Sequence, residues 1–133
     1  MPQARSAAEV YEKVPTVIFP SSAEAARTLA QEVRELIEER ARSGSTAVLG
    51  LATGSTPVPF YRELIRLHRE EKLSFRNVVT FNLDEYYGLP ADHPESYARF
   101  MREQLPDHIH IPPQNIMIPR GTVAPDQHFA QCR

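Results

Sequence analysis

The sequence predicts an α/β fold, a doubly wound parallel sheet with helices on both faces. Short apolar runs alternate along the chain with longer stretches in which apolar residues recur at helical spacing. The apolar runs are continuous, which is typical of parallel strands because both of their faces are covered. The chain has 133 residues, the size of one domain, and 41% of them are hydrophobic, enough for a packed core.

The first predicted elements follow a polar, non-periodic segment at residues 1–13, which we expect to be a flexible arm. Residues 16–19 form a short apolar run that is typical of a buried strand. Ser21 and Glu24 then match a capping box, which predicts a helix that ends near Gly44. We expect residues 14–133 to be the N-terminal part of a single α/β domain.

The middle of the chain predicts two more strands, at residues 47–51 and 77–82, on either side of a helix. Thr56 is the expected N-cap of this helix, and Pro57 suits its first turn because proline lacks the N–H that would otherwise be unpaired there. The second strand of the pair is rich in β-branched residues, as strands commonly are.

The last third of the chain predicts a third helix, a fourth strand and the start of a further helix. Asp92 and Glu95 form a second capping-box pattern, and apolar residues from Tyr97 onward then give the helix a buried stripe. The fourth strand is expected at residues 116–118. Asp126 is the expected cap of the last, short helix.

Charge and composition exclude several classes of protein. Fifteen Lys and Arg against 17 Asp and Glu give a net charge of −2, which supplies no field to collect nucleic acid. No apolar run approaches the roughly 20 residues of a membrane-spanning helix, and the N-terminus resembles no secretory signal. A single cysteine, Cys132, excludes an internal disulfide. We therefore expect a cytoplasmic protein with no nucleic-acid or membrane partner.

Two loops lie where ligands bind in open α/β sheets, beyond the carboxyl ends of the strands. The first contains Thr53, Gly54, Ser55 and Thr56 and leads into a helix N-terminus. Its glycine, hydroxyls and free N–H groups suit a phosphate, although the loop has no lysine. A tight turn with Thr56 as its helix cap fits the same spacing.

The second loop carries two adjacent carboxylates, Asp84 and Glu85, directly after a predicted strand. Adjacent side chains there point in different directions, so we expect at most one of them to face a bound ligand. A carboxylate in that place could move a proton on a sugar. A solvated acidic loop or a helix-capping aspartate is the simpler interpretation. Because the two loops leave strands predicted to be neighbours, we expect them to converge on one crevice.

The histidines predict no metal site. His108 and His110 lie two apart in a proline-rich loop, a spacing that is more typical of surface histidines than of metal ligands. His68 falls at the edge of an apolar helical stripe, and Cys132 has no base beside it.

The two loops carry a resemblance to a known family. Residues 48–57 (VLGLATGSTP) resemble the phosphate-binding segment of glucosamine-6-phosphate deaminases. Residues 74–90 (SFRNVVTFNLDEYYGLP), followed by the run from His93 to Tyr97 (HPESY), resemble that family's catalytic-base segment. The second stretch is the more specific because it is long and continuous.

The resemblance implies a Rossmann-like fold and a hydrolase of amino-sugar catabolism. Such an enzyme converts glucosamine 6-phosphate and water to fructose 6-phosphate and ammonia. It implies no metal and no organic cofactor, and it leaves a homo-oligomer open. Asp84 would be the catalytic base that moves a proton between C2 and C1 of the opened sugar. Glu85 would support that loop or touch substrate, and Thr53, Gly54, Ser55 and Thr56 would hold the phosphate.

The sequence also departs from the family. Its members have a second motif, an Asp-Gly-His segment followed by Asn-Glu-Pro, which opens the sugar ring and which has no match in these 133 residues. The resemblance therefore implies the N-terminal half of such an enzyme, weakly active or inactive alone. One alternative is a 6-phosphogluconolactonase-like hydrolase, in which a basic residue generally follows the Asp-Glu pair where Tyr86 stands here. The other is a non-catalytic module that binds sugar phosphates.

Overall fold

A computed structural model describes residues 14–132, so the arm predicted at residues 1–13 lies outside the described residues. Three strands and three α-helices make up its frame, with short 3-10 helices between and after them. In chain order the elements are α1 (Ser22–Arg42), β1 (Ala47–Leu51), α2 (Val58–Glu71), β2 (Val78–Asn82), α3 (Tyr97–Gln104), η2 (Pro106–His108), η3 (Pro113–Asn115), β3 (Ile116–Met117) and η4 (Pro125–Cys132).

The three strands form one parallel sheet in the order β1-β2-β3, which confirms the predicted α/β class. Leu51 at the end of β1 is paired with Asn82 at the end of β2, so the two strands end at the same level. β3 is short and pairs with the second half of β2.

The strand predicted at residues 16–19 does not form. Val17 is 73% exposed and Ile18 is 91% exposed, and no strand in the described part of the chain pairs with this segment. An apolar composition favours a strand only where a neighbouring strand supplies hydrogen bonds, and no strand among residues 14–132 does so for this segment.

Within residues 14–132 the helices pack on one face of the sheet, where the sequence predicts helices on both. Ala47, Leu49 and Leu51 of β1 are buried, whereas Val48 between them is 59% exposed. β2 shows the same alternation, with Val78 buried and Phe81 48% exposed. The alternation shows that side chains of the described residues cover only one side of each strand.

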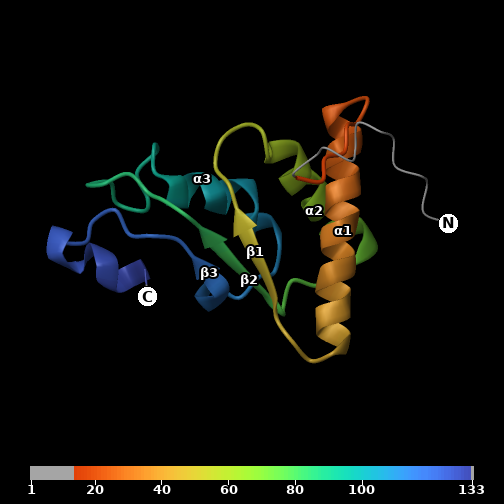
Figure 1. Cartoon of the computed structure of the whole chain (residues 1–133). Coiled ribbons are helices and arrows are strands. Elements are labelled where there is room, and N and C mark those ends of the chain that lie inside the picture. Colours follow the sequence, from red (N-terminus) through yellow and green to blue (C-terminus); the bar gives the residue numbers. More distant parts are fainter. Residues whose placement is uncertain (1–13, 133) are drawn as a thin grey trace.

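The core lies between this face of the sheet and the helices. Its largest fully buried side chains include Tyr61 and Leu64 of α2, Ile37 of α1, and Phe75 before β2. α1 and α2 lie side by side (Figure 1). No helix in the described residues combines the length and apolar character that crossing a bilayer requires.

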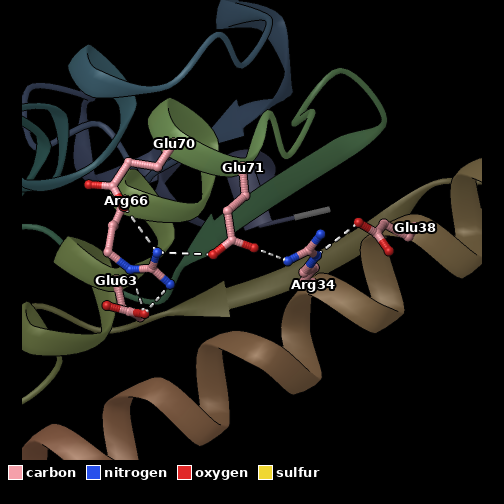
Figure 2. Close-up of polar contacts among 6 residues, drawn as sticks. All are labelled: Arg34, Glu38, Glu63, Arg66, Glu70 and Glu71. Atoms are coloured by element: carbon pink, nitrogen blue, oxygen red, sulfur yellow. Dashed lines mark hydrogen bonds and ion pairs between the residues drawn. The ribbon is translucent and has the colours of Figure 1, made fainter.

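A network of ion pairs joins the outer surfaces of α1 and α2 (Figure 2). Glu71 at the end of α2 accepts hydrogen bonds from Arg66, one turn earlier, and from Arg34 of α1. These two donors lower the pKa of Glu71 below its ordinary value. Arg66 also pairs with Glu63 at 2.7 Å and with Glu70 at 3.1 Å.

The helix ends show where local sequence signals hold. Ser21 caps α1 as predicted, because its Oγ accepts the N–H of Glu24 at 3.2 Å. Thr56 does not cap α2. That helix begins after Pro57 with no side-chain cap, because a turn closed by Val58 N–H and Ser55 O precedes it.

Asp92 and Glu95 do not cap α3, because the chain makes two further turns before the helix starts. The buried Ser96 is the cap, and its Oγ accepts the N–H of Arg99 at 3.1 Å. The predicted last helix is the 3-10 helix η4.

Candidate functional site

The two candidate loops leave the carboxyl ends of β1 and β2 side by side, which confirms that they come from neighbouring strands. The buried side chain of Asn82 fixes this arrangement, because its Nδ2 donates to the carbonyl oxygen of Leu51 at 3.0 Å. The two loops therefore begin directly after residues that are joined by a hydrogen bond. This end of the sheet is the ligand-binding edge of open parallel sheets.

The first loop runs from Ala52 to the N-terminus of α2. Gly54 has φ +94, a conformation that other residues rarely adopt, so the sharp turn depends on glycine. Thr53 is half-buried, and Gly54, Ser55 and Thr56 are exposed. Four residues predicted to hold a phosphate thus lie together on an accessible loop in front of a helix N-terminus, where backbone N–H groups and the helix dipole favour an anion.

Tyr61 of α2 anchors the beginning of this loop. Its hydroxyl donates to the carbonyl oxygen of Ala52 and accepts the Ala52 N–H at 3.0 Å. Burial raises the pKa of Tyr61, so the phenol keeps its proton and its role as donor. The loop is therefore attached to the core through one buried side chain.

Asp84 and Glu85 occupy different environments in the second loop. Asp84 is exposed, whereas Glu85 is half-buried and its carboxylate lies at the N-terminus of α3. Glu85 Oε1 accepts the N–H of Tyr97 at 2.8 Å, and Oε2 accepts that of Ala98 at 2.9 Å. Oε1 also accepts the N–H of Tyr86 at 2.9 Å. Glu85 thus caps α3 together with the N-cap residue Ser96, which accepts a different N–H, and it ties the loop to the helix. The neighbouring Asp84 is exposed.

Tyr97 lies beside the candidate loops, although its sequence context predicts only a place in the buried stripe of a helix. Its side chain is half-buried, and its hydroxyl donates to Tyr86 Oη at 3.0 Å. That hydrogen bond, loss of solvation and the charge of Asp84 raise the pKa of Tyr97, and the side chain of Thr53 acts in the opposite direction. Because Tyr97 interacts with both loops, it marks the place where they converge. The sequence signal that could have identified Tyr97 as a candidate site residue is its position in the HPESY run.

Gly121 packs closely against the loop that carries Asp84 and Glu85. Its carbonyl oxygen accepts the N–H of Gly88 at 2.7 Å. A Cβ at Gly121 would lie 2.2 Å from the carbonyl oxygen of Tyr86 and 2.7 Å from that of Leu89. Only glycine allows this approach, so the segment after β3 fits closely against the loop that carries Asp84.

His68, His108 and His110 lie away from these loops, at the other end of the sheet. His93 lies between the Asp84 loop and α3, where its Nδ1 accepts the N–H of Glu95 at 3.0 Å. His68 donates from Nδ1 to the carbonyl oxygen of Leu73 at 2.7 Å and is half-buried, as expected for the edge of the core. Among the described residues, no group of three or more His, Cys, Asp and Glu side chains is placed to hold a metal ion. The side chain of Cys132 is outside the described part of the structure.

Comparison with known proteins gives consistent matches. The family model of glucosamine-6-phosphate isomerases/6-phosphogluconolactonase matches residues 20–133. The glucosamine-6-phosphate deaminase of Aliivibrio fischeri is 55% identical over 86 residues, which are 65% of this chain and 32% of that protein. A solved monomeric glucosamine-6-phosphate deaminase is 43% identical with a TM-score of 0.75, over 85% of this chain and 44% of that one.

A third match shares the fold alone. The structure of 6-phosphogluconolactonase from Thermotoga maritima is 24% identical, with a TM-score of 0.63 over 77% of this chain and 45% of that one. The chain spans less than half the length of each of these three relatives.

Proposed function

The chain belongs to the family of glucosamine-6-phosphate isomerases and 6-phosphogluconolactonases, and on that premise we propose that it supplies the phosphate-binding and proton-transferring loops of a glucosamine-6-phosphate deaminase. The reaction would convert glucosamine 6-phosphate and water to fructose 6-phosphate and ammonia. The observation that carries the proposal is the convergence of the glycine loop and the Asp84 loop at the ends of paired strands.

Asp84 is the proposed catalytic base. An exposed carboxylate on a loop fixed at both ends can take the proton from C2 of the open-chain sugar and return it to C1. The shift needs one base held over two adjacent carbons, which in turn requires that the far end of the sugar be fixed. Thr53, Gly54, Ser55 and Thr56 would fix it by binding the 6-phosphate at the N-terminus of α2.

Glu85 acts in this proposal as a positioning residue. Both of its oxygens accept backbone N–H groups, so the carboxylate is occupied with holding the loop against α3. Its effect on the reaction would pass through Asp84, whose backbone it holds in place.

A 6-phosphogluconolactonase is the weaker alternative. Tyr86, and not a basic residue, follows the Asp84-Glu85 pair, and the matches to deaminases are closer in identity than the match to the lactonase. A non-catalytic sugar-phosphate-binding module is the other alternative. It differs from the enzyme because it would have no turnover that depends on Asp84.

The 133 residues lack a match to the ring-opening motif, and the glycine loop has no cation. The chain covers less than half of each of these relatives, so we expect this chain alone to release ammonia slowly or not at all. A cytoplasmic role in amino-sugar catabolism, with a hydrolytic release of ammonia, fits the proposed reaction.

The test uses a chimera in which the chain replaces the corresponding N-terminal segment of the Aliivibrio fischeri relative. We expect the chimera to release ammonia from glucosamine 6-phosphate. Asp84→Asn should lower kcat by about 10²- to 10⁴-fold, the usual contribution of a general base, with KM nearly unchanged. An active chimera whose turnover survives Asp84→Asn would contradict the assignment of the base.

A further inference from the structure

An open hollow, lined largely by exposed side chains, lies at the opposite end of the sheet from the two loops. It is a cavity of about 640 Å³ beside the segment that enters β2, within the size range of small-molecule sites. The end of α2, the connection to β2 and the residues around η2 line it. Because these segments precede the strands, while the sugar-phosphate loops follow them, the two places are separated by the length of the sheet.

The charge of this cavity is mainly positive. Arg69, Lys72 and Arg76 line it, against a single carboxylate, Asp107. Asp107 lies 3.9 Å from Arg102 Nε, so its charge is shared with a cation outside the lining. Within residues 14–132, none of the three lining cations forms an ion pair with a carboxylate.

The nearest acidic residues on α2 are engaged elsewhere. Glu70 and Glu71 pair with Arg66, and Glu71 also pairs with Arg34 (Figure 2). The carboxyl end of α2 contributes about half a negative charge to this region. That is less than the charge of the three cations, so the cavity stays positive.

Three histidines, His68, His108 and His110, also line the cavity. Arg69 Nη2 lies 3.1 Å from His108 Nδ1, and since a guanidinium only donates, that nitrogen is an acceptor. His108 Nε2 therefore carries the proton and donates to the carbonyl oxygen of Glu103 at 2.8 Å. These contacts fix the guanidinium of Arg69 at the cavity. The exposed His110, packed edge-on against His68 with ring centroids 5.0 Å apart, adds a further polar edge.

Lys72, at the edge of the same cavity, has an energetically unfavourable backbone conformation. It has φ +59, the only positive φ of a non-glycine residue in the described part of the chain. Helices commonly end in this conformation, but usually with glycine, which adopts it without strain. A lysine here raises the energy of the backbone and places a cation on the cavity, as expected where a side chain has a use of its own.

We propose that this cavity binds a small, multiply charged oxyanion of the phosphate-ester or pyrophosphate class, at a site separate from the sugar-phosphate loops. Three cations without a carboxylate partner among the described residues match an anion with several oxygens, and an arginine held in place presents its donors in a fixed orientation. Arg69, Lys72 and Arg76 supply the charge, and His110 a further hydrogen bond.

The test is a titration of the ¹⁵N-labelled chain with pyrophosphate at low ionic strength, followed by amide chemical shifts. We expect saturable shifts at residues 69–76 and 107–110. Arg76→Gln should weaken binding about three- to tenfold. Lys72→Gly should do the same while leaving the urea midpoint unchanged or higher, because glycine suits φ +59.

Arg27→Gln is the matched control, because it removes the same charge from an exposed position on α1 outside the lining. It should leave the affinity unchanged. The proposal is overturned if pyrophosphate moves no resonance of the lining, or if Arg27→Gln weakens binding as much as Arg76→Gln. Shifts at residues 53–56 report the sugar-phosphate loops separately, so this result and that of the proposed function are independent.

Discussion

The replacement of Glu85 by alanine tests how the acidic loop is held. The side chain is the acceptor for three backbone N–H groups, two of them in the first turn of α3. Loss of a helix cap costs about 0.5–2 kcal/mol, and net loss of a hydrogen bond to a charged group about 1.5–3 kcal/mol. Because Glu85 is half-buried, water can replace part of the lost hydrogen bonding to the N–H groups. We therefore expect the free energy of unfolding to fall by about 2–4 kcal/mol.

Glu85→Gln should cost less, about 1–2 kcal/mol, because the amide oxygen still accepts while the charge and one acceptor are lost. Urea unfolding at 25 °C, followed by circular dichroism, measures both changes, and amide hydrogen exchange at Tyr97 and Ala98 locates them. Glu95→Ala is the control, because this exposed neighbour should change stability by less than about 0.5 kcal/mol. If Glu85→Ala destabilised the protein no more than Glu95→Ala, the capping role would be refuted.

Three further perturbations test the frame around the site. Tyr61→Phe keeps the buried ring and removes the hydroxyl that anchors the first loop, so the free energy of unfolding should fall by about 1–2 kcal/mol, with faster amide exchange in residues 52–54; unchanged exchange would count against the anchor. Gly121→Ala should lower the free energy of unfolding in urea by about 1–3 kcal/mol, because the added Cβ would collide with backbone atoms. Gly50→Ala, with no atom within 4 Å of the added Cβ, should lower it far less. Equal losses of stability would speak against the close approach at Gly121. Because the two arginines lower the folded-state pKa of Glu71, its stabilisation is present above the unfolded pKa and is lost as pH falls through the folded pKa. The urea midpoint of the native protein should therefore exceed that of Glu71→Gln at neutral pH and approach it once the pH is below the folded pKa. A difference that stays constant with pH would refute the assignment.

Local signals in the sequence predicted the frame of the fold well. The continuous apolar run at residues 47–51 is β1, and Ser21 caps α1 as its pattern indicates. Each of these signals is contained within a few residues. The prediction at residues 16–19 was wrong because a strand also needs a neighbour, and composition does not show whether one is available.

The site was predictable in its location and less so in its contacts. That the loops after β1 and β2 would meet followed from the order of strands and the rule for parallel sheets. The capping of α3 by Glu85 joins residues twelve and thirteen apart in the sequence, with several turns between them, and no short pattern encodes such a contact. Tyr97 was assigned to the core because a half-buried aromatic residue fits a helical stripe whether or not its hydroxyl reaches a site.

The loops after β1 and β2 are proposed to form one sugar-phosphate site, and the direct test is a titration of the ¹⁵N-labelled chain with glucosamine 6-phosphate. Glucosamine, which lacks the phosphate, is the matched ligand. We expect saturable amide shifts at residues 53–56 and 84–86 with the phosphorylated sugar and none there with glucosamine. Equal shifts with both ligands, or shifts confined to residues outside these two loops, would contradict this proposal.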